Sequence, residues 1–193
     1  MESRKAITVY TESTPNPASL KFVASQYLLE EGSVEYQHLA DAVNAPFAAS
    51  LFQFSGVKSV FITSNFVTIT KDESLDWYEL SPLLRTYIQQ YLREGSPLFT
   101  GPKIQQADAN VATTITSAID EKIIATLDEY VKPAVEQDGG AILFKSFESG
   151  IVTVVLKGSC SGCPSSTMTL KGGIENLLKQ LIPEVTEVVA EAG

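Results

Sequence analysis

The sequence predicts an α+β protein made of two small domains. Strand patterns and helical apolar periods alternate in both halves of the chain, and 193 residues of which 44% are hydrophobic are enough for two cores. Residues 95–115 differ, because glycine and proline punctuate them and they show no apolar period. We therefore predict domains at 1–94 and 116–193 joined by a linker at 95–115. A surface loop within one domain is the alternative for this stretch.

The first domain is predicted to combine a sheet with two helices. Strand patterns occur at residues 7–10, 20–23, 57–63 and 66–70. The last two flank Ser64-Asn65, which predicts a tight hairpin. Residues 45–54 form a short helix candidate. A longer helix is expected to start at Ser81-Pro82, as an N-cap followed by proline. Its apolar face comprises Leu80, Leu84, Tyr87, Ile88 and Tyr91.

The second domain is predicted to have the order helix–strand–strand–helix–strand. Ser117 and Asp120 resemble a capping box that opens the first helix, and Pro133 should kink or restart that helix. Gly139-Gly140 should end it. A hairpin of 141–144 and 151–156 follows, then a helix that begins at Pro164 and stops at Pro183, and a last strand at 185–189. The expected buried face of that helix is Met168, Ile174, Leu177, Leu178 and Leu181.

Composition and charge exclude several partners. The formal net charge is −9 and no basic stretch interrupts it, so nucleic acid and anionic membranes are poor partners. No apolar run reaches membrane-spanning length. Residues 1–8 (MESRKAIT) lack both the apolar stretch of a secretory signal and the Arg/Ser-rich character of a transit peptide. With two cysteines a reducing compartment is the simpler assumption, and we expect a cytoplasmic protein by default.

Cys160 and Cys163 are the only cysteines, in the run GSCSGCPSS at residues 158–166. Their spacing lets one loop aim both sulfurs at one point, and the loop lies between a predicted strand end and a helix start. Unpaired N–H groups and the positive dipole end of a helix favour thiolate over thiol there. A metal or cluster usually needs four protein ligands. The pair is therefore either a redox couple or half of a site.

Three interpretations of the cysteine pair compete. A thioredoxin-like redox protein is disfavoured, because only thirty residues follow Cys163 and they leave no room for the rest of that fold. A zinc site within one chain lacks ligands, since the single histidine, His38, lies in the other domain without ligand-like neighbours. Two chains facing across a two-fold axis supply four thiolates, which suit a [4Fe–4S] cluster, a [2Fe–2S] cluster or zinc.

No catalytic constellation accompanies the cysteines. A Ser/His/Asp set, a carboxylate pair and a phosphate loop with supporting context are all missing, so the chain is predicted not to be an enzyme. Asp138-Gly139-Gly140 is interpreted as a helix stop and turn. The glycines and serines around Cys160 and Cys163 are poor core residues and predict an exposed loop. Two buried cysteines that serve as small hydrophobic residues are the alternative.

The residues around these motifs resemble the Nfu family. The runs LKGSCSGCPSS, TLKGGIE and IPEV, with VEQDGG upstream, are similar to the C-terminal NifU domain; TPNPASLKF, GVKSVF and LDW are similar to the Nfu N-terminal domain. The resemblance implies an iron–sulfur cluster carrier that receives a cluster from an upstream scaffold and delivers it to apo-proteins. It implies a [4Fe–4S] cluster, alternatively [2Fe–2S], bridged in a homodimer by Cys160 and Cys163 of each chain. For the N-terminal domain it implies a client-recognition or regulatory role.

Overall fold

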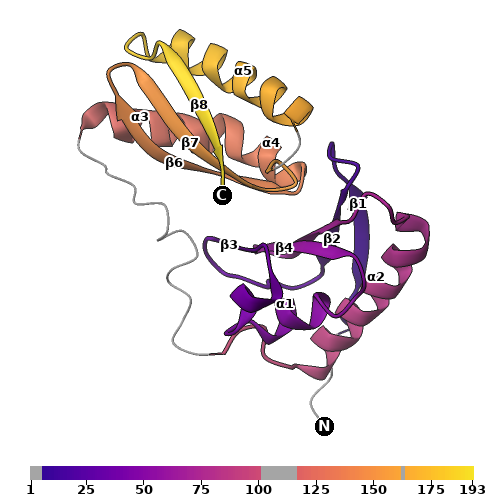
Figure 1. Ribbon diagram of the computed structural model, residues 1–193. Helices are drawn as coiled ribbons and strands as arrows, with labels where there is room; N and C mark the ends of the chain where they lie inside the picture. The colour runs from indigo at the N-terminus through magenta and orange to yellow at the C-terminus, as the bar shows by residue number, and fades with distance from the viewer. Residues whose placement is uncertain (1–5, 101–116, 162–163) are drawn as a thin grey trace. The chain divides into compact units, whose positions relative to one another are not determined.

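The computed structural model describes residues 6–100, 117–161 and 164–193. The chain divides into two compact units, Met1–Ala107 and Asp108–Gly193, and each is considered by itself. Each unit contains one sheet with helices packed on it, which confirms the predicted α+β class (Figure 1).

Unit 1 contains a five-stranded antiparallel sheet with the strand order β1-β2-β5-β4-β3. Its elements are β1 (Val9–Ser13), β2 (Ser19–Ala24), β3 (Ser33–Tyr36), the 3-10 turn η1 (Leu39–Ala42), α1 (Pro46–Leu51), β4 (Val57–Thr63), β5 (Phe66–Lys71) and α2 (Trp77–Glu94). The predicted β4–β5 hairpin is confirmed, with Ser64 at φ +43° in its turn. The short β3 was not predicted, because four residues give too little alternation to detect.

Helices α1 and α2 cover one face of this sheet. Alternate strand residues such as Phe22, Ile62 and Ile69 meet Leu84 and Ile88 of α2 in a core where all five are fully buried. Burial of each such side chain stabilises the fold by about 1.5–3 kcal/mol, which outweighs the modest helix propensities of α2. The apolar period expected for α2 is therefore the face that holds it on the sheet.

Helix α2 begins earlier than predicted, so the expected start at Ser81-Pro82 is wrong. Asp76 is the N-cap, and its Oδ1 accepts a hydrogen bond from the Tyr78 amide at 2.9 Å. Pro82 lies inside the helix. The early start places Leu80 in the core at 8% exposure and lets the Trp77 indole donate to the Pro17 carbonyl at 3.0 Å. Tertiary packing therefore extends the helix beyond the boundary that proline favours locally.

The first residues of the stretch expected to be a linker are attached to unit 1. Gly95 ends α2 in the left-handed region at φ +68°. Leu98 and Phe99 then pack against the core of this unit, and the Thr100 amide donates to the Asn44 carbonyl at 2.8 Å. Residues 101–115 of the expected linker lie outside the described residues.

Unit 2 contains a three-stranded sheet in which β6 and β7 are antiparallel and β7 and β8 are parallel. Its elements are α3 (Ala118–Thr126), the π-helical turn η2 (Leu127–Val131), α4 (Lys132–Gln137), β6 (Gly140–Glu148), β7 (Ile151–Gly158), α5 (Pro164–Leu181) and β8 (Glu187–Ala192). The predicted order is confirmed. The capping box is also confirmed, since Asp120 N–H donates to Ser117 Oγ and Ser117 N–H to Asp120 Oδ2. Pro133 lies in the first turn of α4 and restarts the helix as expected.

The helices of unit 2 pack on one face of the sheet. In β7, Val152, Val154 and Leu156 point into a core that they share with Ile174 and Leu178 of α5. Residues from α3, η2 and α4 join the same core: Ile123, Leu127, Val131 and Val135.

Two residues expected on the buried face of α5 lie elsewhere. Met168 is 76% exposed, because six residues before Ile174 correspond to about 120° around the helix axis from the core stripe. Leu181, the last residue of α5, is 42% exposed, and Ile182 is buried in its place. The helix ends before Pro183, as predicted.

Candidate functional site

The loop that carries the cysteine pair lies where it was predicted, between the end of β7 and the start of α5. Strand β7 ends at Gly158, which adopts φ +69°, and α5 begins at Pro164. The loop therefore leaves the central strand of the sheet and leads directly into a helix N-terminus, where backbone N–H groups favour thiolates. Cys160 is described in this structure. Cys163 lies outside the described residues.

Cys160 is buried, so the expectation of an exposed loop is wrong at this position. Its exposed fraction is 5%, and it belongs to the same apolar cluster as Ile142 and Leu156. A thiol is small and apolar enough for such a place. The loop is closed locally by Ser161, whose amide and hydroxyl both donate to the Gly158 carbonyl at 3.1 and 2.9 Å. From α5, the Thr167 hydroxyl donates to the Cys160 carbonyl at 3.1 Å.

A neighbouring turn, formed by Asp138, Gly139 and Gly140 and called here the 138–140 turn, contacts the loop. The Ser159 amide donates to the Gly139 carbonyl at 3.2 Å, and the Ser159 hydroxyl donates to the Asp138 carbonyl. The sequence indicated this turn only as a helix stop. The signal that could have revealed the contact is the hairpin register, which pairs Gly140 with Gly158 and so brings the turn beside the loop.

Gly140 leaves space for Cys160. A Cβ atom added to Gly140 would lie 2.9 Å from Cys160 Sγ, 3.3 Å from Cys160 Cβ and 2.6 Å from the Lys157 carbonyl oxygen. Real Cβ atoms essentially never come within 3.0 Å of a neighbour, as this one would with Cys160 Sγ and the Lys157 carbonyl oxygen, so the thiol occupies volume that a side chain at residue 140 would need. Gly139 serves a different purpose, because its φ of +82° is the left-handed conformation that ends α4.

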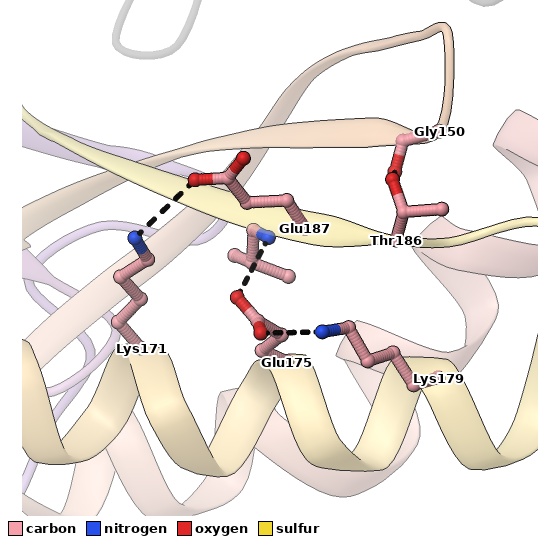
Figure 2. Close-up of polar contacts among 7 residues, drawn as sticks. Gly150, Lys171, Glu175, Lys179, Thr186 and Glu187 are labelled. Atoms are coloured by element: carbon pink, nitrogen blue, oxygen red, sulfur yellow. Dashed lines mark hydrogen bonds and ion pairs between the residues drawn. The ribbon is translucent and has the colours of Figure 1, made fainter.

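A contact network between α5 and β8 holds the helix that follows the loop (Figure 2). Glu175 accepts from Lys179 Nζ at 2.6 Å and from the Val188 amide at 3.1 Å, and these two donors hold the pKa of its carboxyl below the usual range. Lys171 lies 3.9 Å from Glu187 of β8. The sequence signal for Glu175 is its spacing of four residues from Lys179. This network positions α5 and lies away from the cysteine loop along the helix.

One chain does not assemble a closed metal site within its described parts. Among residues 6–100, 117–161 and 164–193, no group of three or more His, Cys, Asp or Glu side chains converges. His38 is an exposed residue of unit 1, and its amide donates to Asp41 Oδ2 at 3.1 Å. The described geometry therefore leaves the cysteine loop as the place in unit 2 where soft ligands are available.

Family comparisons define the class of this protein. Residues 9–95 match the family model described as scaffold protein Nfu/NifU N terminal, and residues 123–189 match the NifU-like domain. Together the two matches cover most of the chain and fall one in each unit, which places the protein in the Nfu/NifU class. The chain belongs to the family of the NFU1 iron–sulfur cluster scaffold homologues and NifU-like proteins, which confirms the resemblance predicted from its motifs.

Similar proteins share most of the chain. The mitochondrial NFU1 iron–sulfur cluster scaffold homolog of Homo sapiens is 40% identical over 185 residues, covering 93% of this chain and 70% of that protein. The mitochondrial NifU-like protein 4 of Arabidopsis thaliana is 37% identical over 190 residues, covering 97% and 67%. The solution structure of a NifU-like protein from Saccharomyces cerevisiae is 26% identical, with a TM-score of 0.47, and covers 53% of this chain and 92% of that one.

These relatives correct the expected location. The human and Arabidopsis proteins are named as mitochondrial, which contradicts the cytoplasmic expectation. That expectation rested on the character of residues 1–8 and on the low cysteine count, neither of which distinguishes one reducing compartment from another.

No helix in the described parts of the chain is both long and apolar enough to cross a membrane.

Proposed function

We propose that this protein is an iron–sulfur cluster carrier that binds a cluster between two copies of the chain and transfers it to apo-proteins. Cys160 and Cys163 of each protomer are the ligands, and the cargo is a [4Fe–4S] cluster, with [2Fe–2S] as the alternative. The protein receives its cargo from an upstream scaffold. It forms a homodimer when loaded, and it acts as a carrier rather than as an enzyme.

The ligand count carries this proposal. The chain has two cysteines and one histidine, and the histidine lies in the unit that carries no cysteine. Clusters of either type are held by four cysteine thiolates, so a second copy of the loop is the simplest source of the missing two. A domain that matches the NifU-like model contains both cysteines.

A shared site of this kind favours transfer over storage. Each protomer holds the cargo through one short loop, so separation of the protomers opens the site without unfolding either unit. Cysteines of the client can then replace those of the carrier one at a time, because thiolate ligands exchange through direct attack by an incoming thiolate. The helix N-terminus at Pro164 supports the thiolate form during each exchange.

For unit 1 we propose a role in recognising client proteins or in regulating transfer. It has its own complete core and contains no cysteine, so it can contribute to delivery without holding the cargo. Deletion of residues 1–94 should leave cluster binding intact and slow transfer to some clients. If the deletion variant and the full chain transferred clusters at equal rates to every client tested, unit 1 would not have this role.

Anaerobic reconstitution with iron and sulfide tests the cargo. The protein should turn brown, develop thiolate-to-iron charge-transfer absorption and dimerise in proportion to the cluster formed. Cys160→Ser and Cys163→Ser should each abolish stable cluster binding, with both units still folded as judged by circular dichroism. A colourless protein that retains zinc alone, or one that rapidly reduces disulfides, would instead support the zinc-bridged dimer or the thiol–disulfide oxidoreductase.

A further inference from the structure

The position of the Cys160 thiol conflicts with the position that a bridging ligand requires. A ligand sulfur must contact iron at about 2.3 Å, as metal–thiolate bonds do, and that iron must also be reached from a second chain. A thiol at 5% exposure, packed with Ile142 and Leu156, faces the interior of its own unit. Cys160 must therefore leave this position before it can share a cluster.

The 138–140 turn is what holds Cys160 in its buried position. On one side, Gly140 offers the volume into which Sγ fits, at the place where a Cβ atom would be 2.9 Å away. On the other side, Ser159 is fixed to the turn through its amide at Gly139 and its hydroxyl at Asp138. Ser159 is itself 2% exposed, so water competes poorly for these two hydrogen bonds.

We propose that the 138–140 turn and Ser159 are positioning residues that keep Cys160 withdrawn and that must release it for cluster loading. Ser159 and Gly140 act through Cys160 and do not themselves contact the cluster. The withdrawn thiol is shielded from oxidants and alkylating agents, and the released thiol is the ligand. This proposal rests on the proposed function, because it takes Cys160 as a ligand of the cargo.

Thiol labelling measures the release directly. In the Cys163→Ser background, iodoacetamide reacts with Cys160 alone, so intact mass reports the rate at which the buried thiol becomes available. When opening and closing are fast, that rate follows the population of the released form. Ser159→Ala removes the hydroxyl that donates to the Asp138 carbonyl and that also lies 3.8 Å from Cys160 Sγ. This substitution should accelerate labelling about fivefold, the effect of one net hydrogen bond.

A matched control separates release of the loop from general loosening of unit 2. Thr186 donates its hydroxyl to the Gly150 carbonyl at 3.1 Å, at the opposite end of the β6–β7 hairpin (Figure 2). Thr186→Val therefore deletes a hydroxyl-to-carbonyl bond in the same unit without touching the 138–140 turn. In the Cys163→Ser background, we expect Thr186→Val to leave the labelling rate of Cys160 unchanged. Gly140→Ala should accelerate labelling further, because its methyl group would lie 2.9 Å from Cys160 Sγ and 2.6 Å from the Lys157 carbonyl oxygen, at the strand end that leads into the loop.

The same variants test the role in loading. With both cysteines present, Ser159→Ala protein should gain charge-transfer absorption faster than wild type during anaerobic reconstitution. The positioning role would be overturned if Ser159→Ala did not change the labelling rate of Cys160 in the Cys163→Ser background. It would also be overturned if Thr186→Val accelerated labelling as much as Ser159→Ala does. Faster labelling without faster loading would overturn the link to cluster binding. Stable shared clusters in Cys160→Ser protein would instead refute the proposed function, whatever the labelling rates show.

Discussion

Replacing Gly172 or Gly173 by alanine should stabilise unit 2. Both glycines lie near the middle of α5, the helix that follows the cysteine loop, and both are exposed. A Cβ atom at either position would meet nothing within 4 Å in the described structure, and neither residue adopts a positive φ. The substitutions therefore add a methyl group without strain and remove the conformational freedom of a helical glycine.

The expected gain is about 1 kcal/mol for each substitution, the difference between alanine and glycine in a helix interior. For a unit of this size, that corresponds to a rise of about 4–8 °C in the midpoint of thermal unfolding. Calorimetry of the full chain measures it. The only tryptophan, Trp77, lies in unit 1, so tryptophan fluorescence reports the unfolding of unit 1. The calorimetric transition that fluorescence does not follow can therefore be assigned to unit 2.

Gly150→Ala provides the opposite control. Gly150 adopts φ +86°, and a Cβ atom there would lie 2.6 Å from Thr186 Oγ1, so this substitution should lower the midpoint. An unchanged or lowered midpoint for Gly172→Ala and Gly173→Ala would contradict this prediction and would mean that the outer face of α5 is packed rather than open to solvent.

The remaining predictions concern the cores, the α5–β8 network and the ligands. Leu178→Ala should destabilise unit 2 by about 2–5 kcal/mol and leave the fluorescence transition of Trp77 unchanged, since Leu178 is fully buried in the other core. Glu175→Gln should lower the midpoint of unit 2 at pH 7. Because the folded pKa of Glu175 is depressed, the difference from wild type should be full above the ordinary pKa of a glutamate and should vanish as pH falls through the lower, folded pKa. If Glu175→Gln changed the midpoint by the same amount at pH 3 and pH 7, the Glu175 carboxylate would not stabilise unit 2 through its charge. Loss of only half of the bound cluster in Cys160→Ser or Cys163→Ser would contradict a shared four-thiolate site, in which every chain must supply both sulfurs.

The sequence predicted correctly those elements that depend on residues close together in the chain. The capping box at Ser117 and Asp120, the β4–β5 hairpin and the helix–strand–strand–helix–strand order of unit 2 each follow from periodicity and turn residues that lie close together in the sequence. The start of α2 did not follow, because the burial of Leu80 and the Asp76 cap outweigh the local preference for a start at Pro82.

The sequence predicted where the cysteine loop lies between the strand and the helix, but it did not predict that Cys160 is buried. The place of Cys160 after a strand and before a helix depends on nearby residues and was predicted. Its withdrawal into the core depends on a contact with the 138–140 turn, some twenty residues away, which only the register of the β6–β7 hairpin creates. Loops rich in glycine and serine are usually exposed, and here the same small residues allow close packing instead.

Native mass spectrometry of the anaerobically reconstituted protein measures whether two chains share one cluster. We expect a species of two 20.9 kDa chains with a single cluster. We also expect this species to dissociate into cluster-free single chains. A single chain that retains an intact cluster, or a dimer that holds one cluster in each chain, would contradict the sharing of one cluster between two chains.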